Sequence, residues 1–347
     1  MKIFCHFLVL RLYHIVTLTK GTKLMPKRKL KKEVKLIIAA LIILIIFLVI
    51  FFTAKVVSKK ASEEFDNYGN ITAVANSTSE VGEIPLTFIM FDVGNGQSIF
   101  IDAGDTEVLI DAGRNDEDAE KIIKTLTEYV DGKLDYIIAS HSDEDHIGGL
   151  AKIYDSFDVS ETIYGNIENN SVNQAYVTKA VTAQNFHKDK DTTITLSPIT
   201  TLTIYDIMDG EENINNNSVV CLLTHGDNTF YIAGDLESEG ETLLRNTITD
   251  VDVMVLSNHG SNLSNTNLDT LHPKICLASC AKNNQEGYIH KEVLEKISEI
   301  SAKCFATYKS GDMTLTSDGK SISYDMSSDD KLKISDAGSK VKKKGGK

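Results

Sequence analysis

The sequence predicts an α/β fold in which strands and helices alternate through most of the chain. Two observations predict it. Between residues 84 and 325, short apolar runs of strand length alternate with segments that carry apolar residues at helical spacing. Histidine and aspartate residues also gather directly after several of these runs. Because parallel strands end at a common edge of their sheet, this pattern places the polar side chains together at that edge.

The densest group of such residues is in Ser140–Leu150, with the sequence SHSDEDHIGGL. The apolar run Leu134–Ala139 comes before it and predicts a buried strand, and a helical pattern begins at Leu150. The loop between them holds the candidate metal ligands His141, Asp143, Asp145 and His146. Imidazole and carboxylate together suit Zn²⁺, Mn²⁺ or Fe. The alternative is a solvated loop whose aspartates cap a helix, but four such groups directly after a buried strand favour a metal site.

This segment resembles the signature loop of the metallo-β-lactamase superfamily, H-x-H-x-D-H followed by glycine. Asp143 stands where the family usually has its second His. The same departure is typical of one branch, the extracellular hydrolase domain of the ComEC/Rec2 DNA-uptake proteins and its small stand-alone relatives. The resemblance implies a four-layer αββα sandwich with the metal site at one edge of the two central sheets.

The opening of the predicted domain resembles the same branch. Leu86–Val93 predicts a strand, and residues 92–98 are similar to the D-V-G-x-G-D-S opening of the ComEC-type domain, with Gln97 in place of the usual acid. The glycines permit a tight turn and a close backbone approach. Two interpretations of Asp92 stay open: a side chain that lines the active site, or one that only forms a turn.

Two later motifs supply the remaining candidate ligands. The run Phe230–Asp235 predicts a strand ending in Gly-Asp, which resembles the family's bridging-aspartate motif and makes Asp235 a candidate ligand. The strand predicted at Val251–Leu256 leads to Asn258-His259-Gly260-Ser261, which resembles the family's H-H-G-S segment with Asn258 in place of the first His. His259 is therefore the expected last ligand. His225 fits a hairpin turn better than a ligand position.

The last motif lies in residues 283–290 and resembles the loop that closes over the active site in this branch. It makes His290 a candidate catalytic residue and Tyr288 a candidate site-lining residue, with an ordinary surface loop as the alternative for His290. A final hairpin is expected at Thr307–Tyr324. The resemblance therefore covers about residues 85–325 in five ordered motifs.

On the superfamily layout, the resemblance implies two divalent ions. His141, Asp143 and Asp235 hold the first ion, and Asp145, His146, Asp235 and His259 hold the second. Asn217 and Ser218 stand where the family has a further His, so the first site is rich in oxygen and Mn²⁺ rivals Zn²⁺. Two such ions make hydroxide available near neutral pH for attack on a phosphodiester or an activated carbonyl. Asp145 joins His290 as a candidate catalytic residue.

The charge is segregated along the chain. Residues 1–60 contain 13 Lys and Arg side chains and a single acidic residue, whereas the whole chain has 36 basic and 49 acidic residues. Residues 36–54 are almost entirely apolar and follow the basic stretch 27–35, which predicts a single-pass membrane helix with the N-terminus in the cytoplasm and the C-terminal domain outside the cell. Met25 is a candidate alternative start of translation, because the basic stretch follows it.

The predicted organisation has five parts: a basic N-terminus (1–35), the transmembrane helix (36–54), a flexible linker (55–83), the hydrolase domain (84–325) and a disordered Lys-rich tail (326–347). The chain has five cysteines but no C-x-x-C pair, which argues against a thiolate zinc site. Those in apolar runs are expected to be buried hydrophobes.

Three functions fit this sequence. The favoured one is a membrane-anchored extracellular phosphodiesterase or nuclease, with a phosphodiester substrate for which DNA is one candidate. A hydrolase of a cell-wall phosphoester or a lactam is the second, and a surface binding module with weak or no catalysis is the third. The acidic body counts mildly against a long nucleic-acid track, because phosphate binding draws on Lys and Arg.

Overall fold

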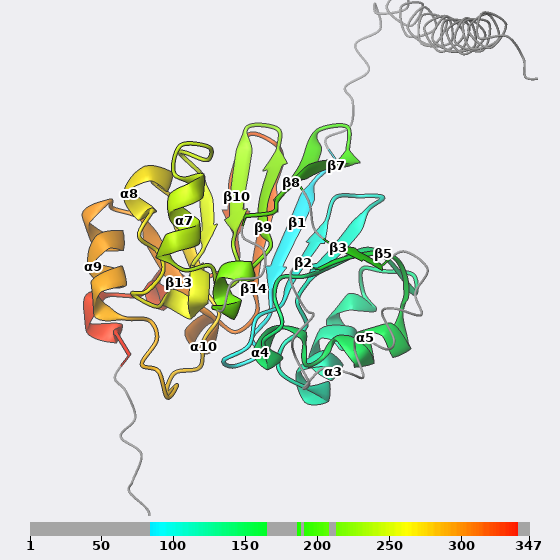
Figure 1. Cartoon of the computed structure of the whole chain (residues 1–347), viewed down its shortest axis with the longest axis horizontal. Helices are drawn as coiled ribbons and strands as arrows, with labels where there is room; N and C mark the ends of the chain where they lie inside the picture. The colour runs from blue at the N-terminus through cyan, green and yellow to red at the C-terminus, as the bar shows by residue number, and fades with distance from the viewer. Residues whose placement is uncertain (1–83, 165–185, 189–190, 208–212, 339–347) are drawn as a thin grey trace, which may run out of the picture. The chain divides into compact units, whose positions relative to one another are not determined.

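The computed structural model describes residues 84–164, 186–188, 191–207 and 213–338 (Figure 1). All of them belong to one compact unit, Glu80–Lys347. The predicted membrane helix at 36–54 and the predicted linker at 55–83 lie outside the described residues. Within the described ranges, no helix is both long and apolar enough to cross a membrane.

Two mixed β-sheets form the centre of this unit. The first has eight strands in the order β15-β14-β1-β2-β3-β4-β5-β6. Its strands are β1 (Leu86–Met90), β2 (Ile99–Asp102), β3 (Glu107–Ile110), β4 (Lys133–Ala139), β5 (Asp158–Tyr164), β6 (Phe186–Lys188), β14 (Met313–Ser317) and β15 (Ile322–Tyr324).

The second sheet has seven strands in the order β13-β12-β11-β10-β9-β8-β7. They are β7 (Thr192–Ser197), β8 (Thr200–Tyr205), β9 (Val220–His225), β10 (Asn228–Ile232), β11 (Val253–Val255), β12 (Ile275–Ala278) and β13 (Lys303–Ala306). In each sheet an antiparallel part continues into four parallel strands: β3 to β6 in the first and β10 to β13 in the second. The carboxyl ends of these parallel strands carry the loops that hold the candidate ligands.

Helices cover the outer face of each sheet, so the unit has the αββα layers that the sequence predicts (Figure 1). On the first sheet lie α3 (Asp116–Leu126), α4 (Glu144–Ile147) and α5 (Leu150–Ser156); on the second lie α7 (Ser238–Leu244), α8 (Leu268–Leu271) and α9 (Lys291–Glu299). Helix α3 begins at Asp116, because the Asn115 side chain caps it by accepting from the backbone N–H groups of Glu117 and Asp118.

Side chains alternate between the layers, as period-2 strands require. In β1, Phe88 and Met90 point into the core between the two sheets, whereas Ile89 joins the core under α3 and α5. Phe88 stacks on Phe230 of the opposite sheet at 5.2 Å between ring centroids. The cysteines Cys221, Cys276, Cys280 and Cys304 are buried, which confirms their predicted role as small hydrophobes.

Two details at the C-terminal end differ from the prediction. Thr307–Ser310 forms a helical turn, α10, instead of the start of a hairpin strand, because Gly311 N–H bonds back to the Thr307 carbonyl; the hairpin is β14–β15. Residues 326–338, predicted to begin a disordered tail, carry the 3₁₀ turns Ser328–Asp330 and Ile334–Asp336. Met326 and Leu332 are buried there, and Leu332 N–H donates to the Cys304 carbonyl, so this segment extends the folded unit.

Candidate metal centre

Five of the predicted ligands converge between the two sheets. His141 comes from the loop after β4, Asp145 and His146 from the short helix α4, Asp235 from the loop after β10, and His259 from the turn after β11. Two groups of possible ligand atoms result, each with all atoms within 4.8 Å of one another. One group is His141, His146 and Asp235; the other is Asp145, His146 and His259.

Asp235 lies at the middle of the cluster. Its carboxylate oxygens come within 3.1 Å of His146 Nε2, 3.6 Å of His259 Nε2 and 4.0 Å of His141 Nε2. The backbone N–H of Asp235 donates to Ser218 Oγ at 3.1 Å, which fixes the start of this loop. A carboxylate in this position can contact both groups at once.

Each histidine of the cluster is held through Nδ1, so that Nε2 faces its centre. His146 Nδ1 donates to the Asp111 carboxylate at 2.8 Å and His259 Nδ1 donates to the Ser279 carbonyl at 2.8 Å. His141 Nδ1 lies 3.0 Å from Ser140 Oγ. Partners of this kind select one tautomer and orient a metal-binding imidazole.

The inward-facing atoms lack hydrogen bonds. Nε2 of His141, His146 and His259 and Oδ1 of Asp235 are all buried without a hydrogen-bond partner. Buried polar atoms without partners are costly, and four of them facing one another call for a ligand that accepts lone pairs from all of them. A divalent cation has that property, so these residues fit the metal that the sequence predicts.

The electrostatics favour a cation in the same place. Burial alone would raise the pKa of Asp235, but His259, His146 and His141 outweigh it and hold the pKa below its ordinary value. Burial alone would lower the pKa of His146, but the Asp235 and Asp111 carboxylates raise this pKa well above its usual range. The carboxylates therefore attract positive charge to the buried centre.

Asp111 is a site residue that sequence reasoning missed. It is fully buried, follows β3 in a left-handed conformation (φ 59°), and accepts from Ser140 N, Ser140 Oγ and Gln97 Nε2 as well as from His146. The Asp-Ala-Gly sequence after an apolar strand could have identified it. Gln97 lies where the resembled family has an acid, and its amide can donate to Asp111, which a second carboxylate could not do.

The glycine-rich turn after β1 is hydrogen-bonded to two segments of the site. Gln97 N–H donates to the Asp145 carbonyl at 3.0 Å, and Ser279 Oγ donates to the Gly96 carbonyl at 2.5 Å. A Cβ on Gly96 would lie 2.6 Å from the Asp145 carbonyl oxygen, so this approach requires glycine. Asp92 is placed in this turn, where its carboxylate accepts from Gly94 N–H and does not join the cluster.

The cluster opens into a cavity of about 430 Å³. Asp143 lies at its wall, 39% exposed and 3.7 Å from His141 Nε2, outside both ligand groups. Asn258 and Tyr288 also line the cavity, and Tyr288 OH donates to Asn258 Oδ1 at 2.9 Å. Asn217 is buried and does not line the cavity, and its amide lies 3.4 Å from the Asn213 carbonyl.

His290 is not brought into the cluster. Its Nδ1 accepts from Asn262 N–H at 2.9 Å, and its Nε2 donates to the Glu286 carbonyl at 3.1 Å. Both ring nitrogens therefore tie loop segments together, and His290 is absent from the residues that line the cavity. This arrangement gives His290 a tethering contact in place of the predicted catalytic one.

The turn that presents His259 has an unusual backbone. Asn258 and His259 are both left-handed, with φ of 48° and 54°. This conformation costs an L-residue about 1–2 kcal/mol, so other contacts must hold the turn.

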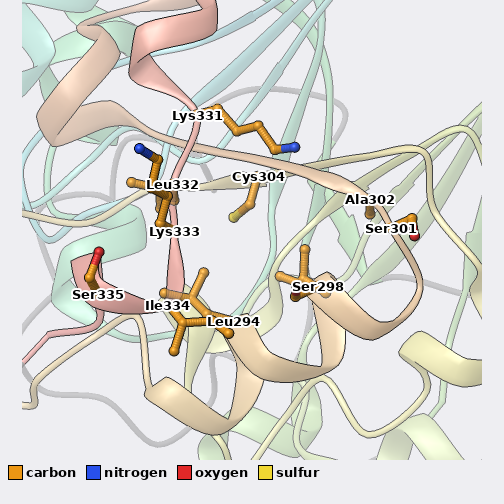
Figure 2. A pocket seen from close by; sticks show the side chains of 11 residues that line it. Leu294, Ser298, Ser301, Ala302, Cys304, Lys331, Leu332, Lys333, Ile334 and Ser335 are labelled. Atoms are coloured by element: carbon orange, nitrogen blue, oxygen red, sulfur yellow. The ribbon is translucent and has the colours of Figure 1, made fainter.

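A larger cavity of about 550 Å³ lies beside α9, between this helix and residues 331–335 (Figure 2). None of its lining residues is His, Asp or Glu, and burial raises the pKa of the Cys304 thiol well above its ordinary value. The ligand chemistry is therefore at the smaller cavity.

Comparison with known proteins defines the class. The model of the metallo-β-lactamase superfamily matches residues 91–275, which include every candidate ligand. The chain belongs to this superfamily, whose fold implies divalent metal binding and whose members are mostly hydrolases.

Within the superfamily, the chain is similar to proteins of the ComEC type. It is 27% identical over 225 residues to Recombination protein 2 of Haemophilus influenzae and 24% identical over 254 residues to ComE operon protein 3 of Bacillus subtilis. These matches cover 63% and 64% of this chain, but only 27% and 32% of the relatives. Among solved structures, the chain is similar to the metallo-β-lactamase-fold protein YhfI of Bacillus subtilis, with a TM-score of 0.45 and 12% sequence identity. The match covers 64% of this chain and 95% of the YhfI chain.

Proposed function

We propose that this protein is a metal-dependent phosphodiesterase held at the outer face of the cell membrane by residues 36–54. The observation that carries the hydrolase part is the buried convergence of three unpaired Nε2 atoms around the Asp235 carboxylate. His141, Asp143 and Asp235 would hold one ion, and Asp145, His146, Asp235 and His259 would hold the other, because a carboxylate can serve two ions whereas His146 offers only its Nε2. Bound divalent cations supply Lewis acidity and a nucleophilic hydroxide near neutral pH.

The protein's own side chains divide the remaining tasks. Asp111, Ser140 and Ser279 orient the imidazoles, and Asp143 can add an oxygen ligand from the cavity wall. The Tyr288 hydroxyl lies at the cavity with a pKa raised by burial, so it stays protonated and could donate to developing charge on the substrate in place of Asn258 Oδ1. An oxygen-rich ligand set makes Mn²⁺ a rival of Zn²⁺.

One observation supports the phosphodiester class and a second bears on the length of the substrate. One relative is named for recombination, a process that acts on DNA, in which phosphodiester bonds join the nucleotides of each strand. Among the described residues that line the cavity, none is Lys or Arg, whereas Glu237, Glu286 and several amides are present. Because nucleic-acid tracks use cationic side chains, this lining favours a short substrate with one phosphodiester over a long strand.

Metal content and turnover test the chemistry. Wild type and Asp235→Asn are compared for bound metal per chain and for hydrolysis of bis(p-nitrophenyl) phosphate, a short oligonucleotide and a chromogenic lactam, each with added Zn²⁺ or Mn²⁺. Asp235→Asn should lower phosphodiester turnover by orders of magnitude. The control is Asp269→Asn, because the Asp269 carboxylate lies on the surface, with its side chain 72% exposed. Wild type that binds metal but hydrolyses none of these substrates would favour a binding module.

The membrane location is tested separately. Protease added to intact cells should remove the domain carrying the metal centre, because the basic stretch 27–35 is expected to stay in the cytoplasm. A domain that stays intact until the cells are lysed would refute the proposed topology without affecting the proposed chemistry.

A further inference from the structure

The left-handed turn at Asn258 and His259 is held by a buried polar network outside the cluster. Asn265 is fully buried, and its side chain contacts both ends of the turn. Asn265 Oδ1 accepts from Ser257 N–H at 3.0 Å, and Asn265 Nδ2 donates to the carbonyls of Ser257 (2.9 Å) and Ser261 (3.0 Å). One amide group therefore fixes the segment with His259 at its centre.

Asn265 is in turn held by Glu241 of α7. The Glu241 carboxylate is fully buried and accepts from Asn265 N–H at 2.7 Å, Thr266 N–H at 2.8 Å and Thr266 Oγ1 at 2.6 Å. All three contacts bring donors to the carboxylate, as an ionised side chain requires. Asn265 is itself left-handed (φ 61°), so Glu241 fixes a backbone conformation that would otherwise be disfavoured.

We propose that Glu241 and Asn265 are positioning residues that set the orientation of His259 Nε2 and thereby the affinity of the centre for its metal. This inference depends on the metal centre of the proposed function. Neither residue forms a hydrogen bond with the side chains of the described ligands, and both act through the Ser257–Ser261 turn. Asp111 orients His146 by a direct hydrogen bond to the ring. Glu241 and Asn265 orient His259 indirectly, by holding the backbone of its turn.

The test measures metal affinity and stability separately. The main variant is Asn265→Gly, because glycine accepts the left-handed backbone and the substitution removes only the side-chain contacts. Glu241→Gln is the second variant and keeps the shape of the side chain while losing an acceptor. Zn²⁺ dissociation constants come from competition with a chelator, and unfolding midpoints are measured on metal-free protein.

Both variants should bind Zn²⁺ roughly 10–100-fold more weakly than wild type, the range seen when groups that orient metal ligands are replaced. The control is Asn228→Gly, which removes another buried asparagine whose contacts with Ser317 and Lys320 do not reach the ligand loops. This variant should lose stability but keep the wild-type dissociation constant.

A double-mutant cycle decides whether the effect passes through His259. In a His259→Ala background, Asn265→Gly should cause no further loss of Zn²⁺ affinity. A loss of the same size in both backgrounds, or an unchanged dissociation constant for both single variants, would overturn the inference while the proposed function stands. If the wild-type protein binds no metal, both this inference and the proposed function are overturned.

Discussion

Two buried histidines at opposite ends of β10 have opposite surroundings. His146 lies near Asp235, which follows the end of the strand, and contacts two carboxylates, those of Asp111 and Asp235. His225 is the last residue of β9, just before the turn into β10, where its Nδ1 lies 3.0 Å from the Thr200 hydroxyl and its Nε2 has no hydrogen-bond partner. Both side chains are fully buried.

Their protonation differs accordingly. Burial lowers the pKa of His225, and the Asp318 carboxylate opposes this effect only in part. Burial acts on His146 in the same direction, but Asp235 and Asp111 reverse the effect and raise its pKa well above the ordinary value. An unpaired buried Nε2 is therefore not enough to identify a ligand; the carboxylates around it are what attract a cation.

The sharpest test of this comparison removes each imidazole in turn. His146→Gln should weaken Zn²⁺ binding at least roughly 100-fold, more than the loss of an orienting group, because His146 itself supplies a ligand atom. His225→Gln should leave the dissociation constant unchanged. Chelator competition measures both, and equal losses in the two variants would show that the neighbouring carboxylates do not distinguish these histidines as metal ligands.

A smaller effect is expected from Asp111→Asn. The variant keeps the shape of the side chain but loses the charge that holds the His146 N–H, so Zn²⁺ affinity should fall roughly 10–100-fold. Asp118→Asn is the matched control, because Asp118 is also buried but bonds to Arg114 instead of a candidate ligand. A similar loss of affinity in the control would mean that Asp111 acts only through general stability.

The parts of this site that are local in sequence could be predicted. His141 and His146 come from six consecutive residues after a strand, and the apolar run before them fixes where that strand ends. The strand predicted at Leu134–Ala139 is found at Lys133–Ala139, and the helix predicted from Leu150 is α5. Asp235 and His259 could be predicted because the segments that hold them follow apolar strands and resemble motifs of the superfamily.

The network around the ligands could not be predicted in the same way. Asp111 bonds to His146, 35 residues away, and Glu241 bonds to Asn265, 24 residues away, so neither pairing leaves a local pattern. The resemblance also placed His290 at the active site, yet its ring contacts Asn262 and Glu286 in this chain. Leu332 lies in a segment of polar composition, so the sequence does not indicate that it is buried. Its place in the core follows from its burial and from the hydrogen bond of its N–H to Cys304 in β13.

The smallest expected effect concerns the pH dependence of folding at His225. Its pKa in the folded state is below the unfolded value of about 6.5, so the unfolded chain binds the extra proton more readily. Keeping His225 neutral therefore stabilises the fold above about pH 6.5, and this stability is lost as the pH falls from there through the lower pKa of the folded state. Urea unfolding at about pH 7.5 and about pH 5.5 should therefore show that acidification lowers the free energy of unfolding less for His225→Gln than for wild type.

His272→Gln, which replaces a histidine whose side chain is 57% exposed, is the control and should follow wild type. If His225→Gln loses as much stability on acidification as wild type, His225 is already charged in the folded protein and the contrast with His146 fails.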